Sequence, residues 1–228
     1  MKRTLSIALV ALFALVLAVP AFAQDAKTVY RVKATKFAEA PIIDGELDDA
    51  AWLQAAKNNS VVAGFVNHPG TILMKNQTVV LVGWDDENLY LAYLNYRDMS
   101  KVTRFEDGTV SFGAEEENEF WFDYNNSGIN SGQFAWDSYG AYTSPSGHST
   151  AGVEVAVKDT PVGWVAEVKI PLANLLVTEP AEGYELGFIF TGYSTEENMY
   201  FGWTPTYGSF NNPPRWGVLE LGPAYTPW

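Results

Sequence analysis

Short stretches of alternating apolar and polar residues fill most of the chain after residue 27. An alternation with a period of two is typical of β-strands that bury one face. In one such stretch, Trp164, Val168 and Ile170 share a face. Glu167 and Lys169 share the opposite face, which we expect to be exposed. Strand signals separated by turn residues predict strands over 28–34, 61–66, 78–84, 88–96, 118–124, 132–139, 152–158, 164–170, 184–193, 198–204 and 216–221.

Helical spacing is clear only over residues 48–57, where Trp52 and its neighbouring alanines recur on one side. A short turn over 172–176 is a weaker second candidate. Many short strands, few helices and no strand–helix alternation predict an all-β fold. We predict an antiparallel β-sandwich of about ten strands, of the jelly-roll or immunoglobulin-like type, with one short helix near the N-terminus. The predicted core comprises Trp84, Leu89, Leu91, Phe120, Phe122, Phe134, Trp136, Trp164, Val168, Ile170, Phe188 and Phe190.

Two of the predicted strands carry polar and aromatic side chains opposite their phenylalanines. If Phe120, Phe122 and Phe134 pack inward, the other face presents carboxylate, amide and aromatic groups together. Such a surface suits a sugar, because polar groups bond its hydroxyls and rings cover its C–H faces. The alternative is an ordinary solvated sheet face with scattered aromatic residues. The residues that would form this surface are Glu119, Trp121, Gln133, Asp137 and Tyr139.

The first 23 residues predict a secretory signal peptide. Lys2 and Arg3 precede an apolar stretch from Leu5 to Val19, and Ala21-Phe22-Ala23 has the small-residue pattern of a cleavage site. The apolar stretch is short for a membrane span, and a retained N-terminal anchor is the alternative. We therefore expect a single domain over residues 24–228 that is secreted or periplasmic and is not inserted in a membrane.

Composition narrows the possible classes of function. The chain has no cysteine, which excludes disulfides, thiol catalysis, cysteine-bound zinc, iron–sulfur clusters and covalently attached haem. Its formal charge is −13, and loss of Lys2 and Arg3 would leave −15. A protein this acidic repels phosphate backbones and anionic lipids, so we do not expect nucleic acid or membrane surfaces as partners. The 8 Trp, 12 Tyr and 13 Phe argue against disorder and suit stacking on a ligand.

Catalysis has little support in the sequence. His68 and His148 are the only histidines, and their turn-like surroundings predict solvated loop residues. The chain contains no serine-hydrolase, zinc-protease, phosphate-loop or EF-hand motif. A glycosidase needs only two carboxylates, and the chain has many. Hydrolysis of a glycosidic bond therefore stays open, although binding without catalysis is favoured.

Five segments together resemble the family 9 carbohydrate-binding modules and the wider DOMON-like group of sandwiches. They occur in the order found in that family and cover nearly all of the predicted domain. Each segment alone is weakly specific, whereas five in order are specific at the level of the fold. The segments are IIDGELDDAAW (42–52), VGWDDENLY (82–90), EENEFWFD (116–123), GWVAEVKIP (163–171) and RWGVLEL (215–221).

The resemblance implies a fold, a ligand class and candidate site residues. The best understood members grip a terminal sugar between two tryptophan rings. By motif, the family's acid falls on Glu119 and its amide on Gln133. One ring position falls on Phe112 and the other on Tyr207 or Phe210, so neither ring is a tryptophan here.

Two further family features concern a basic residue and a metal. The basic residue that follows the amide by two positions is replaced by Ala135, which removes a strong directional donor. A preference for a reducing-end sugar therefore does not carry over. The family also holds structural calcium, for which Glu46 and Asp49 are the candidates here. The alternative role is helix capping by Asp48 or Asp49.

We predict an exported, non-catalytic carbohydrate-binding protein that serves polysaccharide uptake or breakdown, with a partner enzyme that the sequence does not identify. One alternative is a cell-surface interaction module without a small ligand. Another is b-type haem binding, as in some relatives of this sandwich, for which Met74, Met99, Met199, His68 and His148 are the candidate ligands. The predicted glycan site comprises Phe112, Glu119, Trp121, Gln133, Asp137, Tyr207 and Phe210.

Overall fold

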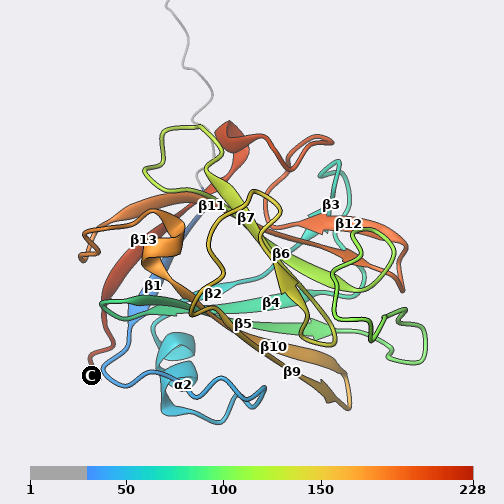
Figure 1. Cartoon of the computed structure of the whole chain (residues 1–228), viewed down its shortest axis with the longest axis horizontal. Helices are drawn as coiled ribbons and strands as arrows, with labels where there is room; N and C mark the ends of the chain where they lie inside the picture. The colour runs from blue at the N-terminus through green and yellow to red at the C-terminus, as the bar shows by residue number, and fades with distance from the viewer. Residues whose placement is uncertain (1–29, 228) are drawn as a thin grey trace, which may run out of the picture.

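The computed structural model describes residues 30–227, so the predicted signal peptide over 1–23 lies outside the described residues. Within 30–227 the chain is mostly β, with one α-helix (Figure 1). The strands are β1 (Arg31–Lys36), β2 (Val61–Val62), β3 (Val66–Asn67), β4 (Thr78–Trp84), β5 (Asn88–Tyr96), β6 (Glu117–Asp123), β7 (Gly132–Asp137), β8 (Tyr142–Thr143), β9 (Glu154–Thr160), β10 (Gly163–Pro171), β11 (Glu185–Ser194), β12 (Met199–Gly202) and β13 (Gly217–Ala224). The helices are α2 (Ala50–Lys57) and the 3₁₀ turns η1 (Leu172–Leu175) and η2 (Pro213–Arg215).

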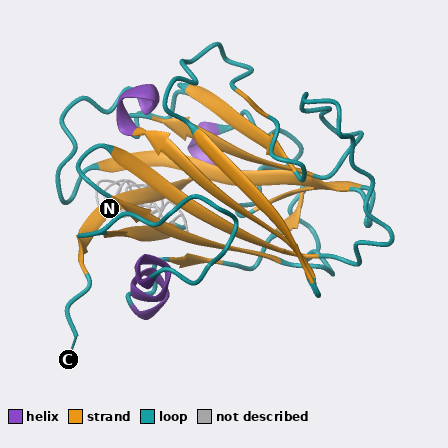
Figure 2. Ribbon diagram, turned by 60° about the horizontal axis from the view of Figure 1, so that its bottom comes forward, coloured by secondary structure: helices purple, strands orange, loops and turns teal. Residues whose placement is uncertain are grey.

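The strands form one continuous sheet that folds back on itself into two packed layers (Figure 2). Their order is β8-β7-β6-β11-β13-β1-β4-β5-β10-β9, with β2, β3 and β12 attached at the side. Tyr93 of β5 contacts Trp136 of β7 and Phe190 of β11, with ring centroids 5.0 and 5.4 Å apart. Strands that are distant in the sheet order therefore face each other across the core.

The first described strand corrects the prediction of a purely antiparallel fold. β1 pairs in parallel with β13, where Arg31 lies opposite Val218. It also pairs in parallel with β4, where Thr35 lies opposite Gly83. Side chains alternate in the same way in parallel and antiparallel strands, so the sequence pattern could not reveal this difference. By entering between β13 and β4, β1 joins the two layers.

All twelve predicted core residues are buried, so that prediction is confirmed. None of them is more than 2 % exposed. Most are aromatic, and each large ring removes much apolar surface from water, which is the main source of stability in a fold without disulfides. Phe120 and Phe122 stack with centroids 6.1 Å apart and face inward, which turns the intervening side chains of β6 to the other face of the sheet.

A second, smaller apolar cluster lies where α2 covers the outer face of the sheet near β4 and β5. Trp52 of α2 is 1 % exposed and packs edge-on against Phe37, and Tyr90 of β5 completes the cluster. Figure 1 shows α2 beside this part of the sheet. The helix begins two residues later than predicted, at Ala50.

The prediction that Glu167 is exposed is wrong, and α2 is the reason. Glu167 is fully buried beneath the helix. Its Oε1 accepts a hydrogen bond from the Trp52 indole nitrogen at 2.5 Å, and its Oε2 accepts one from the Gly45 backbone nitrogen at 2.7 Å. The alternation along β10 correctly separated the two faces, but it carries no information about which segment covers the second face. Lys169, two residues on, stays partly exposed and pairs with Glu154.

The shortest strands account for the difference between about ten predicted strands and the thirteen described. The predicted strand 61–66 is divided into β2 and β3, with Gly64 at φ +82° between them. β8 was not predicted because two residues are too few to show a period. Residues 30–227 contain no helix that is both long and apolar enough to cross a bilayer.

Candidate functional site

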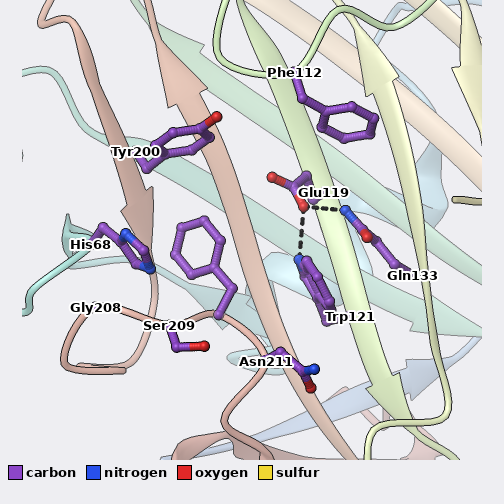
Figure 3. A pocket seen from close by; sticks show the side chains of 10 residues that line it. His68, Phe112, Glu119, Trp121, Gln133, Tyr200, Gly208, Ser209 and Asn211 are labelled. Carbon is purple, nitrogen blue, oxygen red and sulfur yellow. Dashed lines mark hydrogen bonds between the residues drawn. The ribbon is translucent and has the colours of Figure 1, made fainter. Parts of the chain in front are cut away.

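A pocket opens over β6 and β7, on the face opposite the phenylalanines. Glu119 and Trp121 reach it from β6, and Gln133, whose Cα lies opposite that of Trp121, reaches it from β7. Thr191 of β11 lies on the other side of Glu119. Alternation along β6 sends Phe120 and Phe122 to the core and therefore presents these side chains to the pocket. Figure 3 shows Trp121 and Gln133 directed toward the Glu119 carboxylate.

Segments from four other places in the chain form the walls of the pocket. They contribute His68, Phe112, Tyr200 and the stretch 208–211, which includes Phe210. The pocket has a volume of about 380 Å³, in the range of small-molecule sites. Gly113 has φ +68°, and a Cβ there would lie 2.3 Å from the Tyr200 hydroxyl oxygen. Glycine therefore allows the loop to turn tightly against Tyr200 and to carry Phe112 into the pocket wall.

The Glu119 carboxylate is almost fully buried and is fixed in direction. Its Oε2 accepts hydrogen bonds from the Trp121 indole nitrogen, at 2.7 Å, and from the Gln133 amide nitrogen. Trp121 also donates to the Thr191 hydroxyl, at 3.1 Å. Burial raises the pKa of Glu119 to about 7, although the hydrogen bonds from Trp121 and Gln133 act to lower it. Near neutral pH this group therefore changes charge, and its ionised form is a strong acceptor for hydroxyl groups.

The prediction of solvated loop histidines is wrong for both residues. The His68 ring packs against Phe210 with centroids 4.2 Å apart, and its buried Nε2 has no hydrogen-bond partner within residues 30–227. Burial lowers the pKa of His68, which favours the neutral imidazole. His148 packs on Phe122, and its Nε2 lies 2.7 Å from the Ser131 carbonyl oxygen.

Several residues of the pocket wall were not predicted from the sequence. The His68 backbone nitrogen donates to the Tyr200 carbonyl at 2.9 Å, next to the pairing of β3 with β12. This contact brings residues more than a hundred positions apart into one wall. Neither strand is long enough for its pattern to reveal the pairing. The missed lining residues are His68, Tyr200, Gly208, Ser209 and Asn211.

Two predicted site residues do not line this pocket. Asp137 is buried at the end of β7, where its Oδ1 accepts hydrogen bonds from the backbone nitrogens of Tyr139, at 2.8 Å, and Ala141, at 3.0 Å. Tyr207 is 65 % exposed, and the Arg215 guanidinium carbon lies 4.8 Å from the centre of its ring. The other five, Phe112, Glu119, Trp121, Gln133 and Phe210, lie together around the pocket.

The two candidate calcium ligands have other partners. Glu46 pairs with Lys158, and Asp49 accepts a hydrogen bond from the Ile42 backbone nitrogen at 3.0 Å rather than capping α2. Across residues 30–227, no three or more His, Cys, Asp or Glu side chains are grouped so that they could hold a metal ion. Calcium binding by Glu46 and Asp49 stays an untested prediction.

The candidate haem ligands are not gathered at the pocket. His68 is the only one of the five that lines it. Met74 is buried in the main core, and the His148 imidazole is engaged with a backbone carbonyl. A b-type haem needs axial ligands that converge on one iron, and the pocket supplies a single imidazole.

Comparison with solved structures places this fold among known sandwiches. A family 9 carbohydrate-binding module from Caldicellulosiruptor kristjanssonii, in complex with cellotriose, is 19 % identical and superposes with a TM-score of 0.64, covering 87 % of this chain and 98 % of that one. A family 9 module from the same organism in complex with glucose is 18 % identical, with the same TM-score and coverage. A protein from Bacteroides uniformis ATCC 8492 is 12 % identical with a TM-score of 0.61, covering 85 % of this chain and 100 % of that one.

Sequence comparison gives the family directly. None of the curated proteins compared with the chain matches it in sequence. The sequence model of the family described as carbohydrate family 9 binding domain-like, in contrast, matches residues 43–223. This match covers most of the chain and includes the strands and loops that form the pocket around Glu119. The chain therefore belongs to the carbohydrate family 9 binding domain-like family.

Proposed function

We propose that the protein binds a carbohydrate, without catalysis, in the pocket around Glu119. The observation that carries this proposal is the buried Glu119 carboxylate, fixed by Trp121 and Gln133 in a pocket walled by aromatic rings. A carboxylate accepts strong hydrogen bonds from sugar hydroxyls, and rings such as Phe112 and Phe210 cover the apolar C–H faces of a sugar.

The content of the pocket favours binding over hydrolysis. Glycoside hydrolysis uses two carboxyl groups that flank the scissile bond, one as acid and the other as base or nucleophile. Glu119 is the only acidic residue among those that line the pocket. The acids nearest to Glu119 in sequence, Glu117 and Glu116, are fully buried and do not line the pocket. A second carboxylate in reach of the same bond is therefore missing from this pocket.

The structural neighbours in complex with cellotriose and glucose support a glucose-containing oligosaccharide as the ligand. We therefore choose cellotriose as the probe. Two stacked rings and a few hydrogen bonds, less the cost of association, support a net binding free energy on the order of 4–8 kcal/mol. This corresponds to a dissociation constant in the millimolar to micromolar range. Binding must accordingly be measured at high ligand concentration.

Phe112 gives the cleanest test of ring stacking, because its side chain is 42 % exposed and contributes little to the core. A ring stacked on one sugar contributes about 1–2 kcal/mol. We expect Phe112→Ala to weaken cellotriose binding about tenfold in isothermal titration calorimetry, without a change in thermal stability.

Phe105 provides a matched control for this variant. It lies in the same loop, is 39 % exposed and does not line the pocket. Phe105→Ala should leave the affinity for cellotriose unchanged. Equal losses in both variants, or no loss in Phe112→Ala, would place the ligand elsewhere.

The predicted signal peptide extends this proposal to the cellular role. An exported protein that binds a glycan but does not cleave it would hold polysaccharide fragments for uptake, or keep a separate enzyme close to its substrate. Removal of residues 1–23 would leave Gln24 as the first residue. N-terminal sequencing of the protein recovered from its native host tests this, and a sequence that begins at Met1 would contradict export by cleavage.

A further inference from the structure

A second carboxyl group lies beside Glu119 on β6 but does not line the pocket. Glu117 precedes Glu119 by two residues on β6, so both side chains leave the strand on the same face. Glu117 is fully buried, and neither of its carboxyl oxygens receives a hydrogen bond from a donor among the described residues. An ionised carboxylate in such a place would lose its hydration without compensation, which is very unfavourable.

The groups around Glu117 do not supply a positive charge. Arg97, a buried cation just after β5, is paired with Glu116 at 2.5 Å. On the adjacent strands, Asp137 of β7 and Tyr193 of β11 lie opposite Glu117. The first is an acid and the second a neutral phenol, so neither supplies a positive charge. Glu115 adds a further negative charge, although its oxygens accept hydrogen bonds from two backbone nitrogens.

The phenols and the imidazole near the two carboxyl groups do not supply a positive charge either. Burial, and after it the charges of Glu117 and Glu119, raise the pKa of the phenols of Tyr93 on β5 and Tyr200 on β12, so both stay neutral. The His68 imidazole, on the far wall of the pocket, is also favoured in its neutral form. Glu117 therefore keeps an acid proton, and two carboxyl groups on its face of the sheet offer an acceptor: Asp137, across the strand pair, and Glu119, on the same strand.

The hydrogen bonds to Glu119 leave one of its carboxyl oxygens available to accept a proton from Glu117. Trp121 and Gln133 both donate to Oε2, so Oε1 has no donor from either of them. Glu117 and Glu119 lie two residues apart on one face of β6 and are both buried, so this Oε1 and the Glu117 carboxyl share the same buried face of the sheet. We propose that Glu117 is a positioning residue for sugar binding: its protonated carboxyl donates to the Glu119 carboxylate and so holds that carboxylate ionised and oriented in the pocket. This inference rests on the proposed function, since it assigns a second residue to the same site.

The direction of the pKa shifts agrees with this geometry. Burial, and then the charge of Glu119, raise the pKa of Glu117 well above its usual value. The hydrogen bond from Glu117 acts in the opposite direction on Glu119 and lowers its pKa. As the pH rises through about 7, Glu119 loses its proton while Glu117 keeps its own. The affinity for a sugar should rise over the same range, because the ionised acceptor forms the stronger hydrogen bonds.

The test is a titration of the ¹³C carboxyl resonances of the free protein by NMR. In the wild type we expect Glu119 to titrate near pH 7 and Glu117 to stay protonated beyond it. Glu117→Gln keeps a donor toward Glu119 and should leave the Glu119 midpoint within about half a pH unit. Glu117→Met has a similar length but no donor, and should raise that midpoint by about one unit and weaken cellotriose binding about tenfold at pH 7.5.

The outcomes separate this inference from the proposed function. The inference is overturned if Glu117 of the wild type titrates near its usual value, or if Gln and Met at position 117 move the Glu119 midpoint equally. The first of these readouts needs only the wild type, so it stands even if Glu117→Met does not fold. The titration uses no sugar. If both carboxyl groups titrate as expected but the protein binds no saccharide, that result contradicts the proposed function and leaves the contact between Glu117 and Glu119 standing.

Discussion

Replacing Arg97 with methionine is expected to lower the free energy of unfolding by about 3–5 kcal/mol, the usual cost of leaving one member of a buried ion pair alone. The side chains of Arg97 and Glu116 are both fully buried, with Nε and Oε1 2.5 Å apart. The same guanidinium donates to the backbone carbonyls of Tyr96, at 2.9 Å, and Asn76, at 3.1 Å. Methionine fills similar space but removes the only cation paired with Glu116 among the described residues, so that carboxylate keeps only the neutral donors of Thr195, and these carbonyls lose the guanidinium donor.

Urea unfolding monitored by tryptophan fluorescence would measure this loss. Arg104→Met is the matched control, because Arg104 forms a two-bond ion pair with the partly exposed Asp159 at the surface, at 2.7 Å. A surface pair contributes about 1 kcal/mol or less. The double variant with Glu116→Gln should recover part of the stability lost in Arg97→Met, because it removes the unpaired charge. Equal effects of the two arginine variants would contradict the assigned role of Arg97.

Replacing Glu119 with glutamine should act in opposite directions on binding and on stability. Gln keeps the shape and a carbonyl that can accept from Trp121 and Gln133, but it carries no charge. Loss of charge-assisted hydrogen bonds should weaken cellotriose binding at pH 8 by at least about tenfold. The free protein should meanwhile become more stable at that pH, because a buried charge has been removed.

The sign and range of the stability effect follow from the pKa of Glu119. Burial raises this pKa from 4.5 to about 7 in the folded protein, so the folded state holds the proton more tightly than the unfolded state does. The resulting stability is fully present below pH 4.5 and is lost as the pH rises through about 7, by about 3 kcal/mol in total. Glu119→Gln should remove this decline from urea unfolding measured between pH 4.5 and 8. A variant that loses both binding and stability at pH 8 would contradict this account of the site.

The sequence was sufficient to predict those parts of the fold and site that depend on regular alternation. The positions of Phe120 and Phe122 predicted the buried face of β6, and this in turn placed Glu119 and Trp121 together on the other face. Antiparallel pairing with β7 then brought Gln133 beside them. These relations depend only on the two-residue period and on the pairing of neighbouring strands.

The remaining parts depend on contacts between distant segments, which no local pattern records. Glu167 is buried because α2 lies over β10, and the period of β10 is the same with or without that helix. His68 and Tyr200 meet through strands of only two and four residues. Asp137 shares the face of Gln133 on β7, but it lies at the strand end, where the following turn uses its carboxylate. Loops and strand ends therefore account for most of the differences between the predicted and the observed site.

The most direct test of the central claim is a ¹H–¹⁵N NMR titration with cellotriose. The Trp121 indole N–H and the Gln133 side-chain amide both donate to Glu119 in the pocket, and each gives a resolved side-chain signal. The Trp164 indole is buried in the core and serves as an internal control. We predict saturable shifts of the Trp121 and Gln133 signals and none for Trp164. Saturable shifts confined to residues outside the pocket, or no shift with millimolar cellotriose or glucose, would contradict carbohydrate binding at this site.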